Sequence, residues 1–164
     1  DVIIPVQQIV ESIELLNNNL AAGVLPYGGI MTGVGVLSKF VFSKILNADF
    51  FTENSGKTIP MNKRGCGGAI FFNREKYIKA GMENEHLFTW GPDDIERCKR
   101  MEILGYPVKR TDGMIFHLPH PRGVNSGYQD YEEQNTLLEE YINISRMTKD
   151  ELKKYIATWS WINA

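Results

Sequence analysis

Apolar residues recur along the first half of the chain in two patterns, short continuous runs and helical spacing. The run at 2–6 predicts a buried strand, and the segment 7–20 predicts a helix. The apolar face of that helix is expected to consist of Ile9, Ile13, Leu16 and Leu20. A second apolar helix is predicted at 36–46. The segment 49–64 is rich in polar residues and predicts a loop.

The second half of the chain alternates strand-like runs with well-signalled helices. Pro92 suits a first helical position and Gly105 a helix end. Between them, apolar residues recur at about three-residue spacing: Ile95, Cys98, Met101 and Leu104. Beyond Gly127 two more helices are expected, the first with Tyr131, Leu138, Tyr141 and Ile142 on its inner side. Thr148 and Glu151 form a capping box that predicts the start of the second. The pattern indicates an α/β fold with a mixed sheet flanked by helices.

Two adjacent carboxylates, Asp93 and Asp94, fall on the first turn of the helix that follows Trp90 and Gly91. They face the positive end of the helix dipole, so both are expected to be ionised at neutral pH. Such a pair suits a catalytic base, but acidic residues also favour helix starts for capping alone. Trp90 is either an exposed aromatic surface for a ligand or an ordinary core residue.

Glycine and polar loops supply further candidate positions. Gly67 and Gly68 lie in an expected strand, where they either let a ligand approach the backbone or form a β-bulge. Asn84 and Glu85 form a polar loop that suits a hydroxyl-rich ligand or a solvated turn.

Two histidines follow the strand-like run at 114–116. His117 stands at the strand end, and His120 lies beyond Pro119 in a turn rather than on a helix. Either is a candidate metal ligand, and a hydrogen-bonded strand end is the alternative for His120. The pair Lys63 and Arg64 suits a diphosphate contact or a solvated basic surface.

Composition narrows the function classes. The length of 164 residues suits one domain, and 43% hydrophobic and 23% charged residues are ordinary for a globular protein. A net charge of −2 and a pI of about 6.0 argue against nucleic-acid binding. Cys66 and Cys98 are expected to be free, buried thiols, and no run is long enough to span a membrane, which favours a cytoplasmic protein. The C-terminal helix, basic and rich in tryptophan, either packs on its own domain or touches a membrane surface.

The order of motifs between residues 65 and 123 resembles that of a known enzyme group. It runs from the Gly-Gly segment through Gly81-Met-Glu-Asn-Glu and Trp90-Gly-Pro-Asp-Asp to Phe116-His117. This order is similar to the acceptor-side, C-terminal half of inverting glycosyltransferases of the GT-A type. That group, which includes family 2, contains the β1,4-galactosyltransferases and the bacterial chondroitin-type polymerases. The resemblance implies a nucleotide-diphospho-sugar transferase fold.

The resemblance also assigns roles. Asp94 matches the general base and Asp93 a carboxylate that holds acceptor hydroxyls. Substrate contacts are implied for Trp90, Gly91, Gly67, Gly68, Asn84, Glu85 and Tyr27. Asp1 precedes an apolar run and resembles the last carboxylate of an Asp-x-Asp motif, with His117, or His120 as the alternative, completing a site for Mn²⁺ or Mg²⁺. The nucleotide-binding part is then expected to precede Asp1, so that 1–164 is a single acceptor-side domain.

The implied activity is transfer of a hexose or N-acetylhexosamine from a nucleotide sugar to a saccharide acceptor with inversion. We expect UDP as the nucleotide and polysaccharide biosynthesis as the process, with a lipid-linked acceptor as one option. Asp94, His117 and Asp1 are expected on one rim of the sheet. The alternatives are a non-catalytic saccharide-binding module and a metal-dependent hydrolase built on Asp93, Asp94, His117 and His120.

Overall fold

The computed structural model describes residues 1–62, 64–123 and 126–163, so Lys63 lies outside the described residues. The chain divides into two compact units. Unit 1 comprises Asp1–Leu20, Val24–Phe71 and Lys109–Pro121, and unit 2 comprises Ala21–Gly23, Phe72–Val108 and Arg122–Ala164. The chain is a mixed α/β protein, as its patterning predicts.

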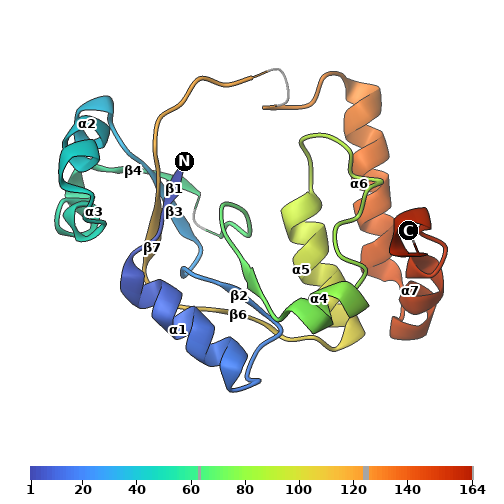
Figure 1. Cartoon of the computed structure of the whole chain (residues 1–164). Helices are drawn as coiled ribbons and strands as arrows, with labels where there is room; N and C mark the ends of the chain where they lie inside the picture. Colours follow the sequence, from blue (N-terminus) through green and yellow to red (C-terminus); the bar gives the residue numbers. More distant parts are fainter. Residues whose placement is uncertain (63, 124–125, 164) are drawn as a thin grey trace. The chain divides into compact units, whose positions relative to one another are not determined.

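Unit 1 is built on a four-stranded mixed sheet with the order β1-β7-β3-β4 (Figure 1). Its strands are β1 (Val2–Ile3), β7 (Met114–His117), β3 (Ile30–Gly33) and β4 (Ile59–Asn62). β7 runs antiparallel to β1 and parallel to β3, while β4 is antiparallel to β3. The observed strand β1 is shorter than the strand predicted from the apolar run at 2–6.

The helices of unit 1 are α1 (Val6–Asn17), α2 (Val36–Ile45), α3 (Asp49–Glu53) and the 3-10 helix Ser55–Lys57. The prediction of a polar loop at 49–64 is wrong, because this segment contains α3, the 3-10 helix and β4. The polar composition hides one anchor. Phe51 is 1% exposed, and its ring lies 5.2 Å from that of Phe116 and 4.9 Å from that of Phe42. With Val34, Phe51 and Phe116 form the buried core beside the sheet.

The predicted apolar face of α1 is also wrong in part. Ile13 and Leu20 are 44% and 51% exposed, whereas Gln8 and Ser12 are buried. The Gln8 amide donates to the backbone carbonyls of Pro26 and Met114, so backbone groups inside unit 1 recruit a polar side chain to the inner face.

The second sheet has the order β5-β2-β6, and the unit boundaries fall at its strands. These are β5 (Phe71–Phe72), β2 (Gly23–Leu25) and β6 (Val108–Arg110). Contrary to prediction, Gly67 and Gly68 precede β5 and are not part of a strand. Cys66, in the same segment, is a free thiol but only partly buried, whereas Cys98 is free and buried as predicted.

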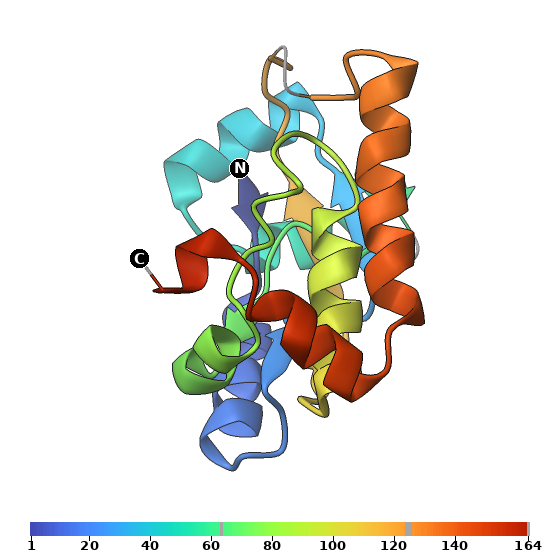
Figure 2. The ribbon, with the colours of Figure 1, turned by 90° about the vertical axis from the view of Figure 1, so that its right-hand side faces the viewer.

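Unit 2 is mainly helical (Figure 2). It contains α4 (Arg74–Lys79), α5 (Asp93–Leu104), α6 (Tyr131–Arg146), α7 (Lys149–Ile156) and the 3-10 helix Ser160–Asn163. α6 and α7 both pack on α5. The predicted capping box is present at Thr148 and Glu151. Leu152, Ile156 and Trp159 join the buried core, so the C-terminal helix packs on its own unit. Within the described part of the chain, no helix combines the length and apolarity needed to cross a membrane.

Two helix faces of unit 2 differ from prediction. On α5, Cys98, Met101 and Leu104 are buried as expected, but Ile95 is 48% exposed. On α6 the buried residues are Leu137 and Ile144, whereas Tyr131 and Ile142 are 76% and 41% exposed. On α5 the inner face is occupied in part by the buried ion pair of Glu96 and Arg100, and Ile95 lies on the exposed side.

Candidate functional site

Asp93 and Asp94 open helix α5. Pro92 is the N-cap rather than the first helical residue, one position from the prediction. Pro92 provides no side-chain cap, so the unpaired N–H groups of the first turn face the carboxylates that follow. A negative charge here interacts favourably with the helix dipole. Gly105 ends the helix in the left-handed conformation, as its type predicts.

Arg97, one turn further along α5, clamps the carboxylate pair. Its Nη1 lies 2.9 Å from Asp94 Oδ1, and its Nη2 lies 3.6 Å from Asp93 Oδ2. On the other side, Nη2 lies 2.6 Å from Glu83 Oε2 and Nε is 2.9 Å from both Glu83 oxygens. The Arg97 side chain is 10% exposed, whereas those of Asp93, Asp94 and Glu83 are 41–50% exposed. The carboxylates therefore stay open to solvent while the cation beneath them does not.

The charges shift the pKa values of this cluster. Burial and then the negative charge of Asp94 raise the pKa of Asp93, although Arg97 opposes the shift. Burial would raise the pKa of Glu83 as well, but hydrogen bonds from Arg97 and from the Tyr77 hydroxyl outweigh it, and that pKa is lowered. Burial and the hydrogen bond to Glu83 raise the pKa of Tyr77 to about 12.

A second arginine fixes the helix below the clamp. Arg100 is fully buried and pairs with the buried Glu96, with Nε 2.7 Å from Oε1. Its guanidinium also donates to the carbonyls of Ala80 and Met82 and lies 5.2 Å from the ring centroid of Trp159. Because every charge is paired or hydrogen-bonded, α5 is held in one register against the turn at 80–82.

Asp93 and Asp94 line a surface hollow of about 500 Å³ with the segment 87–91. Trp90 borders this hollow and is 50% exposed. Its ring meets that of Tyr128 edge to face, with centroids 4.9 Å apart. A half-exposed indole held by an aromatic neighbour is the arrangement expected of a sugar platform, and it is not a core residue.

The other unit 2 candidates lie next to this hollow. Glu85 is exposed and borders a neighbouring hollow. Asn84 is 5% exposed; its amide donates to Glu140 at 2.8 Å, and its oxygen accepts from the His86 backbone. Asn84 therefore shapes the loop. A side chain built on Gly91 would come within 3.2 Å of Leu137, so glycine lets the loop pack on α6.

Three candidates in unit 1 have structural roles. Tyr27 is fully buried and donates a 2.5 Å hydrogen bond to the Gly67 carbonyl. Gly68 has φ +92°, and an added Cβ would lie 2.6 Å from Met31 Cε. This position therefore requires glycine for both conformation and space.

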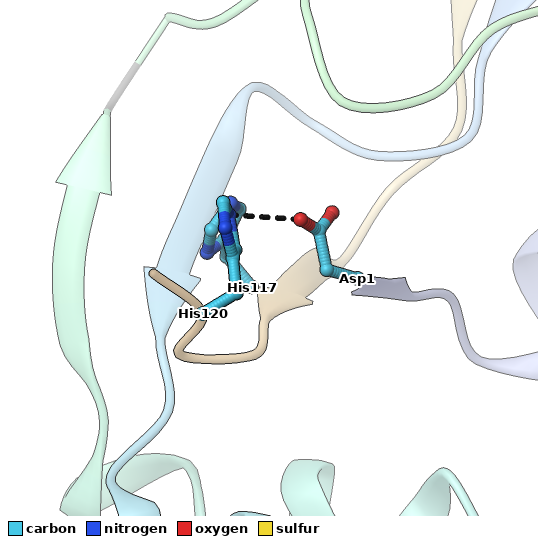
Figure 3. Close-up of side chains that lie close together, drawn as sticks. All are labelled: Asp1, His117 and His120. Carbon is cyan, nitrogen blue, oxygen red and sulfur yellow. Dashed lines mark ion pairs between the residues drawn. The ribbon is translucent and has the colours of Figure 1, made fainter. Parts of the chain in front are cut away.

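Asp1, His117 and His120 form a cluster in unit 1 (Figure 3). The antiparallel pairing of β1 with β7 sets Val2 opposite His117, and the Leu118 N–H donates to the Asp1 carbonyl. The turn after β7 brings the His120 ring back to 5.0 Å from that of His117. His120 Nε2 lies 2.8 Å from Asp1 Oδ2.

The cluster has the donors and spacing of a divalent-metal site. One carboxylate oxygen and two imidazole nitrogens all lie within 4.8 Å of one another. The sequence offered His117 or His120 as the metal-ligand candidate, and in the structure both lie within this cluster. Carboxylate oxygens suit Mg²⁺ and Mn²⁺, and imidazole suits transition metals, so this mixed set fits Mn²⁺ better than Mg²⁺.

The structure thus brings together Trp90, Asp93 and Asp94 in unit 2 and Asp1, His117 and His120 in unit 1. Because Asp94 belongs to unit 2 and the Asp1–His117–His120 cluster to unit 1, their position on a common rim stays a prediction. Sequence reasoning missed Arg97, Phe88 and Tyr128. The spacing of Asp93, Asp94 and Arg97 at i,i+3 and i,i+4 was a signal for the clamp.

Comparison with protein families gives one match. Residues 49–121, fewer than half of the 164, match the family model described as the N-terminal domain of galactosyltransferase. The matched segment includes Trp90, Asp93, Asp94 and both histidines of the cluster. No curated protein and no solved structure matches the chain. The match supports a glycosyltransferase, and therefore a sugar donor and an acceptor in general.

Proposed function

We propose that this chain carries the acceptor side of an inverting, metal-dependent glycosyltransferase with a GT-A fold. It transfers a hexose or N-acetylhexosamine from a UDP-sugar to a saccharide hydroxyl. The observation that carries this proposal is the carboxylate pair at the start of α5, open to a hollow that a half-exposed tryptophan borders. The family match over the same residues supports the reaction class.

Asp94 is the proposed general base. The acceptor oxygen attacks the anomeric carbon from the side opposite the leaving group and loses its proton to the Asp94 carboxylate. The bond from that carbon to the diphosphate oxygen breaks, and UDP leaves with the bonding electrons. Attack from the opposite side inverts the configuration. Asp93 and Trp90 hold the acceptor, one by its hydroxyls and the other by the C–H face of the ring.

Asp1, His117 and His120 would hold Mn²⁺, and the ion would neutralise the charge that develops on the departing diphosphate. One carboxylate and two imidazoles are three protein ligands, and a hard divalent cation usually takes further oxygen ligands, which a diphosphate would supply. We therefore expect weak binding of Mn²⁺ alone and tighter binding when UDP is present.

The base is tested by Asp94→Asn in the complete protein. This change keeps size and removes the basic oxygen, so kcat should fall by roughly 10²- to 10⁴-fold while donor binding changes little. Asp150→Asn is the matched control, because Asp150 lies on α7 with its side chain 87% exposed. Normal turnover by Asp94→Asn would require a different base.

The metal site separates the transferase from its alternatives. Calorimetric titration of Mn²⁺ should show affinity that rises with UDP and falls on His117→Ala or His120→Ala. Tight zinc binding that ignores nucleotide would instead favour the hydrolase. A saccharide-binding module would bind sugars but show neither behaviour.

A further inference from the structure

The hollow at Asp93 and Asp94 continues along helix α6. Phe88 lines both this hollow and the next one, of about 560 Å³, between the loop at 85–88 and α6. Thr136 and Glu139 line that second hollow and a third at the start of α6. The residues that α6 contributes run from Tyr131 to Asn143, a rise of about 18 Å. We call this series of hollows the α6 groove, and it is longer than one sugar ring.

Exposed aromatic rings mark the α6 groove as a saccharide surface. Phe88 is 71% exposed, Trp90 50% and Tyr131 76%. Exposed apolar residues also occur elsewhere on the chain, but here three aromatic rings lie along hollows that polar side chains otherwise line. Rings at intervals, with carboxylates and amides between them, match the alternation of C–H faces and hydroxyls along a glycan.

The charges of the α6 groove have one sign. Seven carboxylates line it: Glu85, Asp93, Asp94, Asp130, Glu132, Glu139 and Glu140. None of the described residues that line it is a lysine or an arginine. The cation nearest the pair at α5 is Arg97, which Glu83 also binds. Glu140 is held by the Tyr155 hydroxyl at 2.8 Å and by Asn84 at 2.8 Å, so its charge is fixed in place.

We propose that the acceptor is an oligosaccharide chain without acidic groups, and that the α6 groove binds its sugars beyond the reacting one. The proposal rests on the proposed function, and it adds the chemical class of the acceptor. A chain of uronic acids or sulfated sugars would place its charges against the carboxylates at distances where like charges repel. Neutral N-acetylated sugars avoid this repulsion, and the positive charge of free amino groups would be attracted to the carboxylates.

Three tetrasaccharides of equal length test the proposal by calorimetry with the complete protein. One contains only N-acetylhexosamine, one carries free amines, and one alternates N-acetylhexosamine with hexuronate. At low salt we expect the anionic chain to bind at least about tenfold more weakly than the neutral chain, and the amine chain at least as tightly as the neutral one. Added salt should weaken amine binding and reduce the penalty of the anionic chain. Equal or tighter binding of the anionic chain would overturn the proposal.

Variants locate the effect. The double variant Glu85→Gln, Glu139→Gln should reduce the difference in affinity between the amine and anionic tetrasaccharides several-fold. Glu102→Gln, an exposed change on α5 that does not line the groove, should leave it unchanged. Phe88→Ala should weaken the binding of the neutral tetrasaccharide more than the binding of a neutral disaccharide made of the same N-acetylhexosamine. If the glutamine pair behaves like the control, the groove does not select by charge.

A transfer assay separates this inference from the function on which it rests. If the tetrasaccharides bind in the expected order but no glycosyl transfer occurs, the proposed transferase function is refuted and the proposed glycan binding by the α6 groove is retained. If hexuronate-containing acceptors are glycosylated efficiently, the proposed transferase function is supported and the proposed selection against acidic acceptors is refuted.

Discussion

Replacing Arg97 by methionine removes the clamp while keeping most of the apolar stem. The guanidinium joins Glu83 to the pair at the start of α5 at N–O distances of 2.6–3.6 Å. Its carboxylate partners are about half exposed, so water can replace much of what they lose. Contacts of this kind contribute about 1 kcal/mol each, and the repulsion between Asp93 and Asp94 is no longer offset. We therefore expect the free energy of unfolding to fall by about 2 kcal/mol, or roughly 4–8 °C in Tm for a chain of this size.

Urea unfolding followed by circular dichroism measures this change. Lys99→Met is the matched control, because it removes the same charge from the same helix. A double-mutant cycle of Arg97→Met with Glu83→Gln should return a coupling energy of about 1 kcal/mol. A loss below about 0.5 kcal/mol for Arg97→Met, or an equal loss in the control, would refute the reasoning.

The effect of Arg97 should depend on pH. The pKa of Glu83 is lower in the folded chain than its ordinary value of 4.5. The unfolded chain therefore binds more protons near that pH, and the contribution of Glu83 to stability is present above it and lost as the pH falls through the folded pKa. Arg97→Met and wild type should accordingly converge in stability in acid.

Three further predictions concern unit 2. Arg100→Met leaves Glu96 buried without its cationic partner, and it should cost about 3–5 kcal/mol in urea unfolding. Gly81→Ala should cost about 2–4 kcal/mol by the same measurement, because φ is +94° and the new Cβ would lie 2.9 Å from Trp159. Tyr77 and Tyr155 have pKa values of about 12 against an ordinary 10.0, so folded protein binds their protons more tightly and stability should fall between pH 10 and 12. Absorbance of tyrosinate should show two late-titrating groups, one lost in each Tyr→Phe variant.

The elements that sequence predicted best were those with chemical end signals. Pro92, which lies one residue from its predicted position, Gly105 and the Thr148–Glu151 box mark helix ends through local hydrogen bonds and φ values, which depend on few neighbours. The segment around Phe51 failed because its local composition is polar, and its burial depends on Phe116, which is distant in sequence. Helix faces failed where partners required polar side chains inside, as at Gln8.

Candidate site residues divided in a similar way. The sequence resemblance placed Asp1 with one of the two histidines in a proposed metal site, and the strand pairing of β1 with β7 and the turn to His120 bring all three side chains together. Tyr27 was predicted from the family resemblance, and Asn84 from the resemblance and its polar loop, but each has an internal partner, the Gly67 carbonyl and Glu140. Residue type alone does not distinguish a polar group that meets a ligand from one that satisfies the backbone.

The two arginines of α5 have a consequence for how acceptor preference can change. Arg100 holds the carbonyls of Ala80 and Met82, and Arg97 holds Glu83, so the start of the segment 84–92 is fastened to α5, the same helix into which the end of the segment leads. Lengthening a surface loop between fixed ends costs only about 0.6 kcal/mol per doubling. Insertions or exchanges at 85–89 would therefore reshape the wall beside α6 and leave the carboxylate pair where it stands. Under the proposed function, a loop-grafting experiment at 85–89 should change which glycan binds without moving the proposed base Asp94.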